Sequence, residues 1–258
     1  MSKYYRGRRK RNLYDPNGSK PFKLSRSRID LFMQCPRCFY MDRRLGLDRP
    51  PGFPFALNSA VDTLLKREFD ECRSKGISHP IQSEYGIDFR PAIRDELDQW
   101  RNNFTGVQFL HEPTNLLLFG AIDDLWINST GEYAVVDYKA TAKSGSITAL
   151  DQPWHAAYKR QMEIYQWLLL RNGLPILNTG YFVYCNGRAD APSFDSRLNF
   201  DVTLIEYYGS SSWVEEVILG IFDCLNSSEI PISDPECDYC LYTSTLNQEP
   251  ISLGPSNP

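Results

Sequence analysis

The 258-residue sequence lacks any run of 18 or more apolar residues, so no segment resembles a membrane-spanning helix. Its first eleven residues hold six Lys or Arg but no apolar stretch, unlike a secretory signal. The seven cysteines are an odd number, which together with the missing signal argues against a disulfide framework. We therefore expect a cytoplasmic protein with no membrane partner, in which closely spaced cysteines bind a metal.

Strong net charge is also lacking. The formal net charge is −4, which argues against a protein that coats nucleic acid by bulk charge but leaves room for a local basic groove. No internal repeat or low-complexity tract divides the chain. Residues 1–20 are polar and basic, with the turn signal DPNG, and predict a flexible arm that is either a solvated tail or a contact to nucleic acid. Residues 21–258 then fit one domain.

Hydrophobic periodicity predicts an α/β fold, in which helices flank a central mixed sheet. Helical patterns cover 25–46, 56–76, 92–100, 153–173 and 211–225, and strand patterns cover 107–110, 120–140 as a pair, 179–185 and 198–207. Pro36 predicts a break in the first helix just after Cys35. Residues after 226 form a proline-rich tail that carries a second cysteine pair.

The strand pair GAIDDLWINSTGEYAVVDYKA, residues 120–140, holds three aspartates and a lysine where a plain hairpin would hold apolar residues. Side chains alternate along a strand, so Asp137 and Lys139 project from one face and Tyr138 projects from the other. The apolar residues AVV precede this triplet, which places it where the strand leaves the core.

A tight turn in the hairpin brings Asp123 beside Asp137, and two neighbouring carboxylates repel each other unless a cation lies between them. Carboxylate oxygens select Mg²⁺ or Mn²⁺, and such an ion activates water and stabilises charge on a phosphoryl oxygen. Lys139 is placed to assist that chemistry. The alternative is a set of surface ion pairs. Asp124 faces the other way and is expected to be a structural acid.

These residues resemble the PD-(D/E)XK nuclease superfamily, and within it the RecB-like and CRISPR-associated exonucleases. The resemblance lies in GAIDD, VVDYKA and QMEIY, in that order, and it implies a restriction-endonuclease-like core. It also implies that Asp123 and Asp137 bind the metal ion, that the carbonyl of Tyr138 adds a ligand, and that Lys139 assists catalysis. In QMEIY, Gln161 and Tyr165 are four residues apart on one helical face, which the resemblance places beside the active site.

One position departs from this family. RecB-like nucleases place a histidine ligand on an upstream helix, where this chain has Asp62. A carboxylate binds Mg²⁺ at least as well, so we expect Asp62 to be a metal ligand, the alternative being an exposed or helix-pairing acid. The three histidines, at 79, 111 and 155, lie outside that stretch and are expected not to be ligands.

Two C-x-x-C pairs lie near opposite ends of the chain: CPRC, with Cys35 and Cys38, and CDYC, with Cys237 and Cys240. Together they supply four thiolates, the set that binds structural zinc or an iron–sulfur cluster. The resemblance implies a [4Fe–4S] cluster, although relatives commonly use one upstream and three downstream cysteines, which keeps zinc as the alternative. We expect 25–46 and 227–245 to form a subdomain around this site.

The sequence thus predicts a metal-dependent deoxyribonuclease. By resemblance, we expect an exonuclease that acts on single-stranded or end-bearing DNA, with partners in recombination, repair or CRISPR adaptation. The alternatives are a catalytically silent nucleic-acid-binding or assembly subunit and a zinc-stapled interaction module. Expected DNA contacts are the N-terminal arm, basic side chains near the first helix and before Gln161, and two aromatic rings: Arg26, Arg28, Arg37, Arg43, Arg44, Lys159, Arg160, Tyr40 and Trp154.

Overall fold

The computed structural model describes residues 7–50, 52 and 56–248. The first six residues of the expected arm and the last ten residues of the expected domain lie outside this description. The described helices are α1 (Arg26–Gln34), α2 (Pro36–Arg43), α3 (Ala56–Lys75), α4 (Pro80–Glu84), α5 (Leu97–Trp100), α6 (Ala156–Arg171), α7 (Val214–Asn226) and α8 (Asp238–Gln248). The described strands are β1 (Phe22–Ser25), β2 (Arg90–Pro91), β3 (Val107–His111), β4 (Leu116–Gly120), β5 (Asp124–Ile127), β6 (Tyr133–Thr141), β7 (Thr179–Gly187) and β8 (Phe200–Tyr208).

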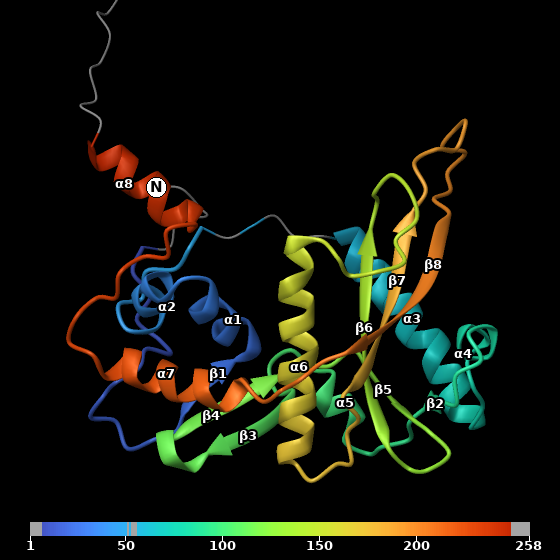
Figure 1. Cartoon of the computed structure of the whole chain (residues 1–258), viewed down its shortest axis with the longest axis horizontal. Coiled ribbons are helices and arrows are strands. Elements are labelled where there is room, and N and C mark those ends of the chain that lie inside the picture. Colours follow the sequence, from blue (N-terminus) through green and yellow to red (C-terminus); the bar gives the residue numbers. More distant parts are fainter. Residues whose placement is uncertain (1–6, 51, 53–55, 249–258) are drawn as a thin grey trace, which may run out of the picture.

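The strands form two mixed sheets (Figure 1). The larger sheet has the order β2-β5-β6-β7-β8, and the smaller sheet has the order β1-β4-β3. In the larger sheet β6 and β7 are parallel and their neighbours pair antiparallel. The chain between β6 and β7 includes α6, as a parallel connection requires. The expected α/β fold with a mixed sheet flanked by helices is confirmed.

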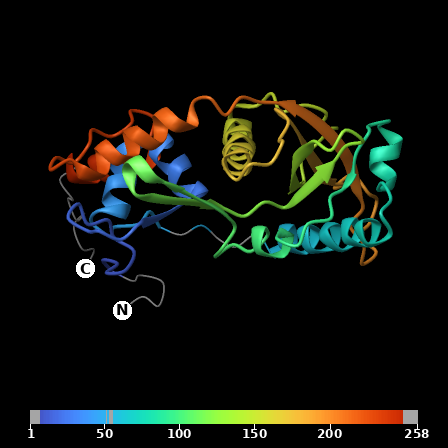
Figure 2. The ribbon, with the colours of Figure 1, turned by 90° about the horizontal axis from the view of Figure 1, so that it is seen from below.

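The larger sheet has helices on both faces, and Figure 2 shows α3 and α6 on its opposite sides. Alternation along β6 explains this arrangement. Val135 joins the core cluster that contains residues of α6, whereas Ala134 and Val136 join the cluster that contains Phe69 of α3. Asp137 and Lys139 lie two and four residues after Val135 in β6, so their side chains are also on the α6 side of the sheet.

Helix α6 also contacts the smaller sheet, so it forms the centre of the molecule between the two sheets (Figure 1). Eight of its sixteen residues are buried, from Met162 to Leu169, because it packs on both sides. Glu163 is among them, and it accepts hydrogen bonds from Tyr207 Oη (2.7 Å), Trp213 Nε1 (2.7 Å) and the Ser210 amide (3.1 Å). This carboxylate therefore ties α6 to the connection between β8 and α7.

The first helix breaks where Pro36 predicts, because Cys35 has extended backbone angles between α1 and α2. The expected arm is not detached over its described part. The Arg9 amide donates to Gly46 O (2.8 Å) and the Arg9 guanidinium pairs with the buried Asp42 (2.8 Å). Gly46 has φ +73°, and a Cβ there would lie 2.2 Å from Arg9 O, so glycine lets the two segments meet.

Several elements differ from the predictions. β1, β2, β4, α4 and α8 were not predicted, and the expected helix over 92–100 is reduced to α5. The CDYC pair does not lie in an irregular tail, because α8 begins at Asp238 and carries Cys240.

None of the helices in the described part of the chain has both the length and the apolar character needed to span a bilayer.

Candidate active site and four-cysteine cluster

The triplet at the end of β6 meets α6 through a small polar network. Asp137 is fully buried, and its Oδ2 forms an ion pair with Lys139 Nζ. Gln161 Nε2 donates to Asp137 Oδ1 (2.8 Å), and Lys139 Nζ donates to Gln161 Oε1 (3.3 Å). Gln161 Nε2 also lies 3.2 Å from Tyr165 Oη. The structure thus brings together Asp137, Lys139, Gln161 and Tyr165.

Asp123 reaches the same strand end from the segment before β5. Its Oδ2 accepts a hydrogen bond from the Tyr138 amide (2.9 Å), which fixes it next to the triplet. Its Oδ1 lies 3.6 Å from Lys66 Nζ, and this ammonium also pairs with Asp62 Oδ2 at 2.9 Å. Lys66, one turn after Asp62 on α3, therefore bridges the two acids. The sequence analysis missed Lys66, although its i,i+4 spacing from Asp62 was a usable signal.

Burial and the nearby charge of Asp123 raise the pKa values of Asp137 and Asp62. Burial raises the pKa of Asp137 to about 6; the charge of Asp123 adds to this effect, while Lys139 opposes it. Burial also raises the pKa of Asp62, and the charge of Asp123 again contributes. A cation placed among these acids would relieve both the repulsion and the cost of burial.

The residues fit a divalent cation in one further respect. Asp137 Oδ2 is buried and has no hydrogen-bond partner of normal geometry apart from its ion pair with Lys139. Within the described residues, however, only the four cysteines form a group of three or more ligand atoms all within 4.8 Å. Asp62, Asp123 and Asp137 are gathered around the strand end, with Lys66 and Lys139 as their counterions. Asp62, Tyr138 and Lys139 line one cavity of about 210 Å³ here.

The glycine of GAIDD has a steric role. Gly120 ends β4, and a Cβ at this position would lie 2.6 Å from Cε1 of Tyr165. The Tyr165 ring is buried and also lies 5.9 Å from the Arg26 guanidinium. Gly120 therefore gives Tyr165 the space to reach Gln161.

Asp124 faces away from Asp123, as expected, and is the centre of a buried network. Its Oδ1 accepts from Arg101 Nη2 (2.9 Å) and pairs with Arg73, and its Oδ2 accepts from Tyr138 Oη (2.8 Å). Arg101 Nε also donates to the carbonyl of Asp123 (2.9 Å). The network joins α3, α5 and the two strands, and it fixes the backbone that presents Asp123. Both arginines were missed by the sequence analysis.

Four of the nine side chains expected to contact DNA are paired or buried within the fold. Arg28 and Arg43 pair with the buried Asp42, and Arg160 Nε lies 2.6 Å from Asp30 Oδ1. Arg43 and Tyr40 are buried, so neither offers a surface to DNA, contrary to expectation. Arg26 differs, because its charge lowers the pKa of Asp137 and therefore acts on the candidate site.

The two C-x-x-C pairs converge as predicted. Cys38 Sγ lies 3.6 Å from both Cys237 Sγ and Cys240 Sγ, and Cys35 Sγ lies 3.8 Å from Cys240 Sγ. A tetrahedral zinc ion with Zn–S bonds of about 2.3 Å requires sulfurs about 3.8 Å apart. The thiolates of a [4Fe–4S] cluster bind different irons and must stand farther apart. The cluster joins the N-terminal and C-terminal regions.

Arg49, absent from the sequence predictions, completes the surroundings of this cluster. Its Nη2 lies 3.4 Å from Cys237 Sγ, and its guanidinium lies 4.6 Å from the centre of the Tyr239 ring. Burial alone would raise the pKa of Cys237, but hydrogen bonds from the Cys240 amide and the neighbouring thiols lower it to about 7. Burial raises the pKa values of Cys38 and Cys240, so of these three thiols Cys237 is the first to form the thiolate that metal binding requires.

The remaining cysteines lie outside the cluster. Cys185 is buried, whereas Cys72 and Cys224 are partly buried, and burial raises the pKa of Cys185 and Cys224 to about 11. Of these three thiols, Cys185 alone is fully buried.

Comparison with known proteins agrees with this site. The chain matches the family described as the PD-(D/E)XK nuclease superfamily over residues 23–245, a range that holds the candidate active site and all four clustered cysteines. No curated protein matches the chain significantly. The superfamily consists typically of metal-dependent phosphodiesterases that act on nucleic acids. Because the match covers most of the sequence, the chain belongs to the PD-(D/E)XK nuclease superfamily.

Proposed function

We propose that this protein is a metal-dependent deoxyribonuclease that hydrolyses DNA phosphodiester bonds at the end of β6. The observation that carries the proposal is the fully buried Asp137, which lies close to Asp123, has the Lys139 ammonium as its counterion, and has a pKa raised by burial. Burial of the Asp137 carboxylate beside a second carboxylate, that of Asp123, costs free energy and does not help the hairpin to fold. Binding of a cation gives a reason for this burial.

Asp123 and Asp137 would hold Mg²⁺ or Mn²⁺, with Asp62 and the carbonyl of Tyr138 as further ligands. When bound, the ion would supply an activated water and stabilise charge on the phosphate. Lys139 is oriented by Gln161, whose Oε1 accepts a hydrogen bond from the ammonium at 3.3 Å and whose Nε2 donates to Asp137, so the ammonium is positioned for the anionic phosphoryl oxygens. Tyr165 supports Gln161 from one turn farther along α6.

Lys66 has a related role in this proposal. With its ammonium 3.6 Å from Asp123 and 2.9 Å from Asp62, it neutralises two ligand carboxylates in the ion-free protein. A divalent ion held by these acids would replace Lys66 as their counterion, and the Lys66 ammonium would then be available to the phosphate of the substrate.

The finer features of the substrate are also proposals. By the family resemblance, the enzyme is an exonuclease on single-stranded or end-bearing DNA, and its partners belong to recombination, repair or CRISPR adaptation. The candidate site opens on a small cavity of about 210 Å³ that is lined by side chains from both α3 and α6.

The test is cleavage of labelled single-stranded DNA in Mn²⁺ by the purified full-length protein, with and without chelator. We expect Asp137→Ala to lose activity by at least about 10³-fold, since it removes a ligand and the partner of Lys139. Asp98→Ala, an exposed acid on α5, is the matched control and should cleave normally. Cleavage that survives chelation, or an active Asp137→Ala protein, contradicts the proposal.

One observation favours the alternative of a catalytically silent DNA-binding subunit. Lys66 neutralises Asp62 at the position where relatives have a histidine, and a permanent ion pair there would keep the metal out. A protein that binds the labelled strand but cleaves it in neither Mg²⁺ nor Mn²⁺ would support this alternative. Recovery of cleavage in Asp62→His would then identify Asp62 as the cause.

We further propose that the four clustered cysteines hold one structural Zn²⁺ ion and not a [4Fe–4S] cluster. Sulfur separations of 3.6 to 3.8 Å support zinc, because they match the edges of a tetrahedron around a single ion. Anaerobic purification followed by metal analysis tests this choice. We expect about one zinc per chain and no visible iron–sulfur absorption; about four irons per chain would contradict it.

A further inference from the structure

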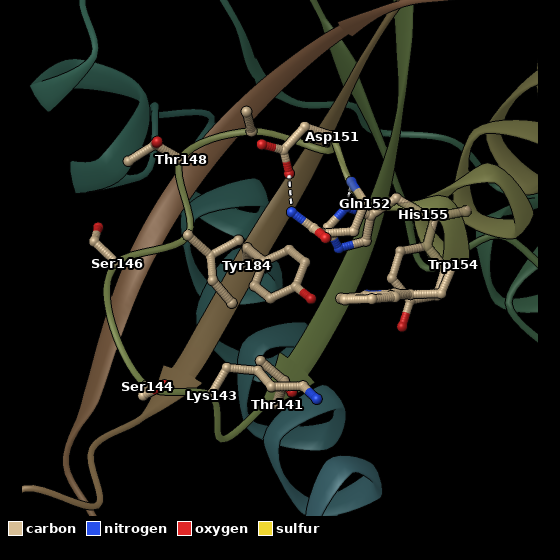
Figure 3. Close-up of a pocket in the computed structure, with 13 residues that line it drawn as sticks. Thr141, Lys143, Ser144, Ser146, Thr148, Asp151, Gln152, Trp154, His155 and Tyr184 are labelled. Atoms are coloured by element: carbon tan, nitrogen blue, oxygen red, sulfur yellow. Dashed lines mark hydrogen bonds between the residues drawn. The ribbon is translucent and has the colours of Figure 1, made fainter.

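A second cavity lies beside the candidate active site and has no part in the chemistry proposed above. It encloses about 490 Å³ between the loop that follows β6 and the start of α6. Figure 3 shows the loop with Ser144, Ser146 and Thr148 arching around Tyr184, with Trp154 and Gln152 on the α6 side. The lining thus combines aromatic rings with neutral hydroxyl and amide groups.

Trp154 is the unusual member of this lining, because 57% of its surface is exposed. Trp100, Trp126 and Trp167 are all buried in the core. The Lys143 ammonium lies 5.6 Å from the centre of the Trp154 ring, so the ring meets a mobile cationic side chain and not packed hydrocarbon. A large exposed ring in a concave wall is a surface on which a flat ligand can stack.

The cavity borders the candidate active site at one shared residue. Tyr158 lines both this cavity and the smaller one that contains Asp62 and Lys139. The Lys139 ammonium lies 4.6 Å from the centre of the Tyr158 ring. A DNA strand whose phosphate lies at Lys139 would therefore place an adjoining nucleotide at Trp154.

We propose that this cavity is a base pocket, which receives one unpaired nucleobase next to the phosphate being cleaved and stacks it on Trp154. The proposal rests on the proposed function and adds the part of the substrate that is recognised. The lining includes one Lys and one Asp, Lys143 and Asp151, whose charges are opposite. Its hydroxyl and amide groups are neutral and can hydrogen-bond to an uncharged heterocycle. A base held in a duplex is stacked and paired, and it cannot enter, so the pocket selects single-stranded DNA.

The test is a double-mutant binding cycle that removes the bases from the DNA and the Trp154 ring from the protein. A chelator is present throughout, so that no strand is cut. Anisotropy gives the affinity of the full-length protein for a labelled thymidine dodecamer and for a backbone of the same length that carries only abasic residues. Truncation of a stacking aromatic costs about 1–3 kcal/mol per base, or roughly 5- to 150-fold in affinity. Trp154→Ala should therefore weaken thymidine binding by such a factor and change abasic binding by less than about 2-fold.

Two further variants separate stacking from a general loss of structure. Trp154→Phe keeps a flat ring, so it should bind thymidine within about 3-fold of wild type while losing the quenching of tryptophan fluorescence by DNA. Phe104→Ala removes another exposed ring, from the loop before β3, and should change neither affinity. Equal weakening of both ligands by Trp154→Ala, no weakening of either, or the same pattern in Phe104→Ala would overturn the base pocket.

The cycle also separates this inference from the proposed nuclease. Selective loss of thymidine binding in a protein that never cleaves DNA would support the pocket and contradict the nuclease. Normal cleavage by a wild-type protein whose Trp154→Ala variant shows no selective loss would contradict the pocket alone.

Discussion

Asp124 shows how one buried charge can organise residues that are far apart in the sequence. Its carboxylate is fully buried and meets Arg73, Arg101 and the hydroxyl of Tyr138. Because Arg101 also holds the Asp123 carbonyl, the network determines where Asp123 stands. Asp124 therefore affects the active site through the backbone without entering it.

We predict that Asp124→Asn destabilises the protein by about 3–5 kcal/mol, because it leaves the Arg73 and Arg101 guanidinium groups without their buried counterion. Urea unfolding followed by circular dichroism measures the change. Asp98→Asn, an exposed acid on α5, is the control and should stay within about 0.5 kcal/mol of wild type. Equal stability of the two variants would show that the network contributes little.

Single residues also show what sequence reasoning can reach. The side-chain alternation of a strand was enough to place Asp137 and Lys139 on one face and Tyr138 on the other, because that rule is local. The partners Arg73 and Arg101 lie 51 and 23 residues from Asp124. Only the packing of α3 and α5 against the sheet brings them together, and no local pattern encodes it.

At the scale of elements, α6 and β4 meet at Gly120. The glycine leaves space for the Tyr165 ring, and Tyr165 supports the Gln161 amide that orients Lys139. The position of the helix relative to the strand therefore depends on the absence of a side chain.

We predict that Gly120→Ala lowers DNA cleavage by at least about tenfold while costing only about 1–3 kcal/mol of stability, as overpacking does. The added methyl group would lie 2.6 Å from the ring carbon Cε1 of Tyr165 and so force the ring away from Gln161. Cleavage assays and urea unfolding measure the two effects. Gly220→Ala in α7 meets only ordinary contacts, from 3.6 Å, and should keep full activity. Full activity of Gly120→Ala would remove Gly120 from the positioning of this site.

Element prediction succeeded where periodicity extends over many residues and failed where it does not. α3, α6 and β7 lie close to their expected ranges. β1 has only four residues and β2 only two, too few to show a period, and both exist because a neighbouring strand pairs with them. Leu57 and Leu64 of α3 are both 58% exposed, because the helix packs on the sheet through the side that carries Leu65 and Phe69.

At the scale of the whole molecule, the four-cysteine cluster links α1 and α2 to α8. Cys35 and Cys38 flank the start of α2, while Cys237 and Cys240 lie at the start of α8. The sequence predicted the pairing of the two ends because closely spaced thiols have few other uses in a reducing compartment. It could not predict the sulfur separations that favour zinc over iron, since those depend on the packed fold.

We predict that Cys240→Ser lowers both the bound zinc and the melting temperature, the latter by on the order of 10 °C. The reason is that several kcal/mol of metal binding are lost, and each kcal/mol corresponds to about 2–4 °C in a chain of this size. Metal analysis and differential scanning calorimetry measure the two losses. Cys72→Ser, on α3 and outside the cluster, is the matched control and should change neither value by much. Unaltered zinc in Cys240→Ser would refute the assignment.

The separation of these cysteines along the chain has a consequence for the order of assembly. Cys38 and Cys237 are 199 residues apart, and Cys35 and Cys240 are 205 apart. During translation Cys35 and Cys38 emerge long before Cys237 and Cys240. Both sheets are therefore synthesised before the four thiols can meet. The two regions of a nascent chain thus stay unlinked until α8 has been made.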